Sequence, residues 1–224
     1  MKKQIALTLA FAGLWAGQAL ALELDTDKKR FSYFVGLQVG QQIKSDGIEL
    51  DESAFVAAIK DVVAGATPRL SQEELQATLQ RVQQQRAADA AKAGETNLLE
   101  GQRFLTSNKK KAGVKETASG LQYTVIKAGA GAKPKGTSTV EVHYRGTLIN
   151  GTEFDSSYSR GQPATFPVNG VIKGWTEALQ LMQEGAKWQL FIPSELAYGS
   201  RGTGADIGPN STLIFDVELL KIKN

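Results

Sequence analysis

The spacing of apolar positions predicts helices in the first half of the chain. The segment "RFSYFVGLQVGQQIK" carries apolar residues at near-helical intervals, namely Phe31, Phe34, Val35 and Ile43, and the turn residues "SDG" follow it. Asp51 stands where the N-cap of a second helix is expected, and that helix, "ESAFVAAIKDVVAGA", stops at its glycine. Both helices are short, and we expect neither to form a core alone.

A third helix is predicted to be long and mostly polar. Ser71 followed by Glu74 is the pattern of a capping box, and no proline interrupts the next 40 or so residues, enough for a helix of about 60 Å. Its apolar stripe is thin and consists of Leu75, Leu79 and Val82. A helix this polar cannot be buried on all sides. The segment is therefore either disordered or a solvated spacer helix, and its many strong helix-forming residues favour the spacer. Gly94 and Gly101 are the positions at which it could break.

Two glycines in the first predicted helix suggest an interface. Gly36 and Gly40 lie four residues apart and would let a second helix approach closely. We therefore predict that the two short helices form a dimer interface; the alternative is that these glycines are only weak helix positions. These patterns divide the chain into a helical dimerisation domain at residues 22–70, a connecting helix at 71–112 and a strand-rich domain at 113–224.

The period of the apolar pattern changes from helical to two after residue 113. Four segments alternate in this way: "LQYTV", "TVEVHYRGTL", "AKWQLFI" and the C-terminal "TLIFDVELLKI". Before the last two, "GWTEALQLMQEG" presents one apolar helical face, made of Trp175, Ala178, Leu179 and Met182. We expect an α+β fold in which an antiparallel sheet curls around one short helix.

Residues 1–21 have the composition of a cleavable export signal. Lys2 and Lys3 precede an apolar run, and small residues end at Ala21. A membrane anchor is the alternative, but the run is too short to span a bilayer. We expect export from a bacterial cytoplasm to the periplasm, with surface or outer-membrane association left open, and a mature chain that begins at Leu22.

Charge and cysteine content exclude several classes of protein. The chain has 26 Lys and Arg residues and 23 Asp and Glu residues, and removal of Lys2 and Lys3 with the signal leaves 24 against 23, so the pI of about 9.0 is no evidence for a nucleic-acid partner. The chain has no cysteine, which excludes disulfides, thiol nucleophiles, thiolate metal ligands and lipid attachment to a cysteine. We expect no cofactor and no metal.

Common catalytic groups are scarce in this sequence. The alternation of its strand places the single histidine, His143, beside charged residues on a solvated face, so we do not expect it to act as a base or metal ligand. Nucleophile elbows, zinc-protease motifs and phosphate-binding loops are absent from the sequence. The C-terminal half instead has more aromatic residues than packing needs, which indicates an apolar ligand pocket. Rotation about an X-Pro amide suits such a pocket, because it requires neither a proton transfer nor a nucleophile.

Four motifs resemble those of FKBP-type peptidyl-prolyl isomerases. They are "VHYRGTLINGTEFDSS", "VIKGWTEALQLMQEGAK", "LAYGSRG" and "IGPNSTLIFDVELL", in the family's order, and the resemblance covers about residues 120–224. The segments "GLQVGQQIKSDGIELD" and "TASGLQY" and the capped long helix resemble the N-terminal part of the secreted, Mip-like subfamily. The resemblance implies a V-shaped homodimer that acts on prolyl-containing unfolded or partly folded proteins and combines isomerase with chaperone activity.

The resemblance also implies the site residues. Catalytic roles fall on Asp155, on the hydroxyl of Tyr198 and on the backbone N–H of Ile172, while Trp175 forms the floor under the proline ring. The remaining substrate contacts fall on Tyr144, Phe154, Val171, Ile207 and Phe215. Asp155 lies in "GTEFDSSYSRG", which we interpret as a glycine-bounded turn at the pocket rim, where the carboxylate orients substrate without transferring a proton.

Two supporting residues and two departures complete the comparison with the family pattern. Arg160 pairs with Asp155, and Phe166 packs below the pocket rather than lining it. Many relatives have an aromatic residue where this chain has Ala164, and its loop "GSRGTGADIGPN" supplies Ile207 without a second adjacent isoleucine. We therefore expect a more open rim, which leaves the affinity for macrolide inhibitors open.

Two functions of different classes fit these features. One is an isomerase with turnover, and the other is a holdase chaperone or prolyl-peptide-binding module with little turnover. The complete set of pocket motifs favours the enzyme, whereas a dimer with two separated pockets favours client capture.

Overall fold

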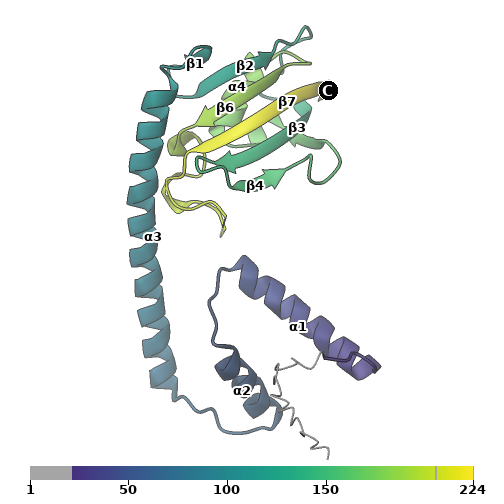
Figure 1. The fold of residues 1–224 in the computed structure, drawn as a ribbon, viewed down its shortest axis with the longest axis vertical. Helices are drawn as coiled ribbons and strands as arrows, with labels where there is room; N and C mark the ends of the chain where they lie inside the picture. Colours follow the sequence, from purple (N-terminus) through teal and green to yellow (C-terminus); the bar gives the residue numbers. More distant parts are fainter. Residues whose placement is uncertain (1–21, 205, 224) are drawn as a thin grey trace, which may run out of the picture. The chain divides into compact units, whose positions relative to one another are not determined.

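The computed structural model describes residues 22–204 and 206–223. The predicted export signal lies in residues 1–21, outside the described residues. Three helices, α1 to α3, precede a C-terminal domain built on a seven-stranded sheet (Figure 1). None of the described helices combines the length and the apolar character needed to cross a membrane.

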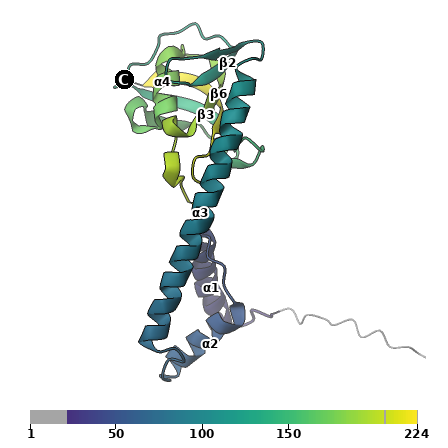
Figure 2. The ribbon, with the colours of Figure 1, turned by 90° about the vertical axis from the view of Figure 1, so that its left-hand side faces the viewer.

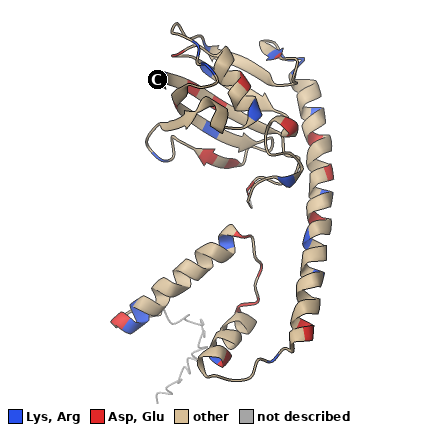
Figure 3. Cartoon of the chain, turned by 180° about the vertical axis from the view of Figure 1, so that it is seen from behind, with Lys and Arg blue, Asp and Glu red and all other residues tan. Residues whose placement is uncertain are grey.

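Helices α1 (Asp27–Ser45) and α2 (Glu52–Val63) agree with the predicted segments to within three residues at each end, and neither of these described helices contains a buried residue. The carboxylate of Asp51 accepts a hydrogen bond of 2.8 Å from the backbone N–H of Ala54, which confirms the predicted N-cap. Charged residues occupy only the ends of α1, and residues 31–43 carry none (Figure 3). An apolar stretch therefore stays exposed on α1.

Helix α3 (Gln72–Asn108) runs for 37 residues without a break, or about 55 Å at the usual rise per residue (Figure 2). The capping box is confirmed, because the Ser71 hydroxyl accepts from the N–H of Glu74 while the Glu74 carboxylate accepts from the N–H of Ser71. Gly94 and Gly101 do not interrupt the helix, and both are buried.

The sheet is antiparallel, with strand order β1-β2-β6-β7-β3-β4 and with β5 paired to β3. Its strands are β1 (Val114–Glu116), β2 (Gln122–Lys127), β3 (Thr139–Leu148), β4 (Glu153–Ser156), β5 (Ala164–Pro167), β6 (Lys187–Ile192) and β7 (Leu213–Lys223). Helix α4 (Lys173–Leu181) packs into the curl of the sheet (Figure 1). Short 3-10 helices are η1 (Val168–Gly170), η2 (Ser194–Leu196) and η3 (Gly199–Arg201).

The core lies between α4 and the inner face of the sheet. The apolar face predicted for α4 is buried, as are the inner positions of β3, β6 and β7, which confirms the alternation: Val140, Val142, Tyr144, Trp188, Leu190, Ile192, Leu213, Phe215, Val217 and Leu219. The predicted α+β fold, with an antiparallel sheet curled around one short helix, is therefore confirmed.

The outer face of the sheet is also covered at one end, which the alternation did not predict. Gln122 and Phe191 point away from the core, yet both are buried, because the end of α3 lies over them. The ring of Phe104 lies 5.9 Å from that of Phe191, and the Gln122 amide nitrogen donates to the carbonyl of Leu105 at 3.0 Å. Helix α3 is thus not solvated along its whole length.

The short edge strands β1, β4 and β5 were not predicted, since three or four residues are too few to display an alternating pattern. The segment "GTEFDSSYSRG" is correspondingly more than a turn. Its residues 153–156 form β4, in which Asp155 pairs with Gly146 of β3. The sheet therefore fixes the direction of the Asp155 side chain.

Candidate active site

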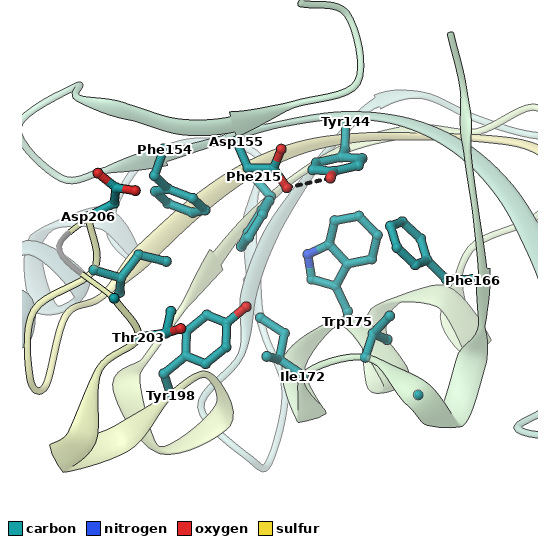
Figure 4. Close-up of a pocket in the computed structure, with 14 residues that line it drawn as sticks. Tyr144, Phe154, Asp155, Phe166, Ile172, Trp175, Tyr198, Thr203, Asp206 and Phe215 are labelled. Atoms are coloured by element: carbon teal, nitrogen blue, oxygen red, sulfur yellow. Dashed lines mark hydrogen bonds between the residues drawn. The ribbon is translucent and has the colours of Figure 1, made fainter. Parts of the chain in front are cut away.

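A cavity of about 660 Å³, within the range usual for small-ligand sites, opens between the inner face of the sheet, the start of α4 and the loop after Tyr198 (Figure 4). Its walls are mostly aromatic and aliphatic. The lining residues are Tyr144, Phe154, Asp155, Phe166, Gly170, Val171, Ile172, Trp175, Tyr198, Thr203, Gly204, Asp206, Ile207 and Phe215.

Trp175 forms the centre of the aromatic cluster. The rings of Tyr144, Phe166 and Phe215 lie edge-on to its indole, with centroids 5.3, 6.0 and 5.2 Å away and interplanar angles of 82–89°. Edge-to-face rings hold one another in place, so the indole is a rigid surface. Gly174 helps to position it, because a Cβ at this residue would lie 2.6 Å from the Ile192 side chain and force α4 away from β6.

A second glycine makes room for the phenyl rings of the wall. A Cβ at Gly146 of β3 would lie 2.6 Å from the ring of Phe154 and 2.7 Å from that of Phe215. Because Gly146 has no Cβ, these two rings pack edge to face, with their centroids 5.5 Å apart, directly over the strand backbone. The exchange of one hydrogen atom for a methyl group would therefore push both rings into the cavity.

The polar groups of the wall form one network around Asp155. The Tyr144 hydroxyl donates to Asp155 Oδ2 at 2.5 Å (Figure 4). Arg160 donates to Asp155 Oδ1 and, at 2.7 Å, to the Tyr144 hydroxyl oxygen. The Arg160 guanidinium also lies 5.5 Å from the centroid of the Tyr144 ring. The carboxylate is thus held from both oxygens in a fixed orientation.

The network sets the protonation states of the site. Partial burial by itself would raise the pKa of Asp155, but the hydrogen bonds from Tyr144 and Arg160 outweigh it and hold the pKa below its ordinary value. Burial, and next the hydrogen bond to Asp155, raises the pKa of Tyr144. Burial, and next the Asp155 charge, raises the pKa of Tyr198. At neutral pH Asp155 is therefore ionised, and the phenols of Tyr144 and Tyr198 are protonated.

Three donors at the cavity have no acceptor among the described residues. The Tyr198 hydroxyl points into the cavity (Figure 4), and no hydrogen bond of the described chain engages it or the backbone N–H of Ile172. The indole Nε1 of Trp175 is buried and likewise unpaired within the described chain. Buried donors are usually satisfied, so unpaired donors at a cavity are available to a ligand that brings carbonyl oxygens.

All nine residues predicted to catalyse or contact substrate line this cavity: Tyr144, Phe154, Asp155, Val171, Ile172, Trp175, Tyr198, Ile207 and Phe215. Arg160 lies outside the lining but bonds to Asp155. Phe166, expected below the pocket, instead lies in its wall, because β5 pairs Phe166 with Val140, an inner position of β3. Ala164 is not part of the lining.

Sequence reasoning missed Gly170, Thr203, Gly204 and Asp206 in the lining. The glycine-rich composition of residues 199–208 marked a loop, but no pattern indicated which of its side chains face the cavity. His143 lies elsewhere, on the outer face of the sheet. Its ring stacks on Tyr158 at 4.6 Å, and its Nδ1 lies 2.9 Å from the Ser157 hydroxyl. Among the described residues, no cluster of three or more His, Cys, Asp or Glu side chains could hold a metal.

Comparison with known proteins assigns the chain to a protein family. Residues 130–220 match the model of the FKBP-type peptidyl-prolyl cis-trans isomerases, and residues 28–125 match that of the domain amino terminal to this isomerase. The outer membrane protein MIP of Legionella longbeachae is 44% identical over 225 residues, with 97% of each chain covered. The FKBP-type 22 kDa peptidyl-prolyl cis-trans isomerase of Escherichia coli K12 is 50% identical, with 88% of this chain and 97% of the relative covered.

A solved structure supports the same assignment. The crystal structure of FkpA from Escherichia coli superposes with a TM-score of 0.63 at 41% identity, covering 89% of this chain and 98% of that one. The resemblance of the four sequence motifs is thereby confirmed. The chain belongs to the family of FKBP-type peptidyl-prolyl cis-trans isomerases and is an enzyme of that class.

Proposed function

We propose that the chain is an exported isomerase that accelerates X-Pro isomerisation in folding proteins, with the aromatic cavity on Trp175 as its active site. One observation carries this proposal: the unpaired donors of Tyr198 and Ile172 border a cavity whose other walls are largely aromatic. Such a cavity suits a peptide whose proline ring lies on the indole while its carbonyls accept hydrogen bonds at the edge.

The barrier to rotation about the amide is about 18–20 kcal/mol, because the twisted state loses amide resonance. Water stabilises the planar, charge-separated amide, so transfer of the bond into an apolar cavity raises the planar form relative to the twisted one. Donors that bond the twisted form more strongly than the planar form lower the barrier further. A 10⁵-fold acceleration requires only about 7 kcal/mol from these effects together.

Each residue has a separate role under this proposal. Trp175 is the floor for the proline ring, and the Ile172 N–H and the Tyr198 hydroxyl bind substrate carbonyls. Asp155 stays ionised and supplies a fixed negative charge beside the twisting amide, while Arg160 holds it from the solvent side. No proton moves in any of these steps.

Two matched tyrosine variants test the proposal in a proline-limited refolding assay with the full chain. Tyr198→Phe removes the hydroxyl in the cavity and should lower catalysed refolding about threefold, the worth of one weak hydrogen bond. Tyr158→Phe is the control, because Tyr158 is equally exposed but lies on the outer face of the sheet. Asp155→Ala should lower the rate further, since it removes the charge and frees Arg160.

The outcomes separate the enzyme from the rival holdase. Catalytic acceleration by the wild type at substoichiometric concentration, lost in part with Tyr198→Phe, supports turnover in the cavity. An effect only at stoichiometric concentrations, equal for all variants, would reject the isomerase site and leave a prolyl-peptide-binding chaperone.

We also propose that α1 and α2 form a homodimer interface, so that residues 22–70 act as a dimerisation domain ahead of the connecting helix and the isomerase domain. Each of the two helices exposes large apolar side chains, and exposed apolar patches usually mark an interface. Phe34→Glu should give monomers in sedimentation analysis. Ile126→Glu is the control, because Ile126 is as exposed as Phe34 (55% and 54%) but lies on β2. A dimer that survives Phe34→Glu, with loss of client protection instead, would assign this face to client capture.

Export is proposed from residues 1–21, and one relative is named an outer membrane protein. The N-terminal residue of protein recovered from a periplasmic extract should be Leu22. Recovery of full-length chain in the membrane fraction would instead indicate an uncleaved anchor.

A further inference from the structure

Helix α3 consists of an exposed half and a docked half. Residues 72–93 are almost all exposed, whereas the following half presents one covered face at heptad spacing: Gly94, Asn97, Leu98, Gly101, Phe104, Leu105 and Asn108. Spacings of three, four and seven residues place these side chains in one stripe. The docked half therefore packs on the C-terminal domain along its length.

The docked half of α3 runs beside the segment that leads into β7 and contacts it (Figures 1 and 2). A Cβ at Gly94 would lie 3.1 Å from the Cβ of Pro209, and one at Gly101 would overlap the Thr212 hydroxyl and lie 3.2 Å from the Thr212 Cβ. Such contacts are tighter than ordinary packing. The two glycines thus let the helix backbone lie directly against residues 209–212.

Hydrogen bonds join the same surfaces. Asn97 Nδ2 donates to the carbonyl of Pro209 at 2.9 Å and lies 3.4 Å from the Ser211 hydroxyl. In the other direction, Asn210 Nδ2 donates to the carbonyl of Gly94 at 3.2 Å. Asn210 has a φ of 55°, a left-handed conformation that asparagine adopts more readily than most other residues except glycine. These hydrogen bonds fix residues 209–211 against the helix.

The held segment belongs to the wall of the active site. We define residues 199–211, of which all but residue 205 are described, as the pocket loop. The N–H of Asn210 donates to the carbonyl of Gly199 at 2.8 Å, next to Tyr198, and Thr203 and Ile207 exchange backbone hydrogen bonds of 2.8 and 3.3 Å. Thr203, Asp206 and Ile207 line the cavity. A continuous series of contacts therefore leads from Asn97 to the cavity wall.

We propose that the docked half of α3 clamps the pocket loop and that Asn97 is a positioning residue for substrate binding. It does not touch substrate; it holds the loop that does. The inference rests on the proposed function of the cavity. Because the loop binds substrate before and during rotation about the amide, its loosening weakens binding of both forms and raises KM more than it lowers kcat.

The test uses the full chain with two changes at Asn97. Asn97→Asp keeps the shape of the side chain but removes its donor, and Asn97→Ala removes the side chain. Gln102→Ala is the control, since Gln102 is exposed on the same helix one residue from Gly101. Loss of the one short hydrogen bond should raise amide exchange in the pocket loop about fivefold and KM for a Leu-Pro peptide by a similar factor, with kcat within about twofold.

Each result decides the question. Wild-type exchange in the pocket loop of Asn97→Asp would show that no clamp exists. Faster exchange throughout β7 as well as in the loop, with KM unchanged, would reduce Asn97 to a general packing role and overturn the proposal. Amide exchange requires no substrate, so it tests the clamp even if the wild type fails to isomerise peptides, an outcome that would reject the proposed function instead.

Discussion

The substitution Gly101→Ala tests whether α3 is part of the isomerase domain. In an exposed helix this change stabilises a protein by about 0.5–1 kcal/mol, because alanine is the better helix former. At Gly101 the added methyl would overlap the Thr212 hydroxyl and lie 3.2 Å from its Cβ. Overpacking of this kind costs about 1–3 kcal/mol. The two effects together predict a net destabilisation of about 1–2 kcal/mol.

Urea unfolding followed by tryptophan fluorescence measures the change in the free energy of unfolding of the isomerase domain, because Trp175 and Trp188 both lie in that domain. Gln102→Ala is the matched control and should change the free energy of unfolding by less than about 0.5 kcal/mol. Thr212→Ala removes the hydroxyl that the new methyl would strike. The double variant should therefore lose less stability than the sum of the single variants, by about 0.5–1 kcal/mol.

Two results would refute the reasoning. A more stable Gly101→Ala variant would show that helix propensity alone acts at this position, so the helix would not pack against Thr212 in solution. Strict additivity in the double variant would show that the methyl and the hydroxyl do not meet. Either result would also remove the packing on which the proposed clamp of the pocket loop depends.

Four further predictions concern residues of the cavity. Because Asp155 has a lowered pKa and Tyr144 and Tyr198 have raised ones, kcat/KM should stay level from about pH 5 to 8, and a change of rate within that range would contradict these roles. The stability from Asp155 should be complete above its unfolded pKa of about 4 and be lost as the pH falls through its lower folded pKa, which acid titration of unfolding can measure. Tyr144→Phe removes the hydroxyl that bonds Asp155 and Arg160 and should lower kcat/KM about fivefold, while unchanged activity would separate the network from catalysis. Asp206 lines the cavity and forms no ion pair with any described residue, so Asp206→Asn should lower the preference for Lys-Pro over Glu-Pro peptides about two- to fivefold, and an unchanged ratio would contradict this.

Local patterns predicted most elements of this fold because one local cause decides each of them. The apolar face from Trp175 to Met182 and the alternation in β3 and β7 follow from burial on one side. The caps at Asp51 and Ser71 follow from unpaired N–H groups at the start of a helix. The aromatic excess indicated a pocket, but only the resemblance to a family identified its individual residues.

The parts that escaped prediction depend on distant segments. Nothing near Gly94 or Gly101 indicates that Pro209 and Thr212 will pack there, so the glycines were interpreted only as positions of weakness. Phe166 was misplaced because its wall position depends on the register of β5 against β3. Thr203 and Asp206 lie in a loop that is hydrogen-bonded to α3. The residues joined by these bonds are more than 100 positions apart in the sequence, so no local pattern indicates them.

The division of α3 into an exposed and a docked half also sets a length scale. Residues 72–93 rise about 33 Å along the helix axis before the first docked glycine. An extended polypeptide spans at most about 3.5 Å per residue, so a client segment must be at least nine or ten residues long to run beside this exposed half from end to end. Under the proposed function, a peptide shorter than this that occupies the cavity cannot also lie along the whole exposed half of α3, so short-peptide assays report on the cavity without that half of the helix.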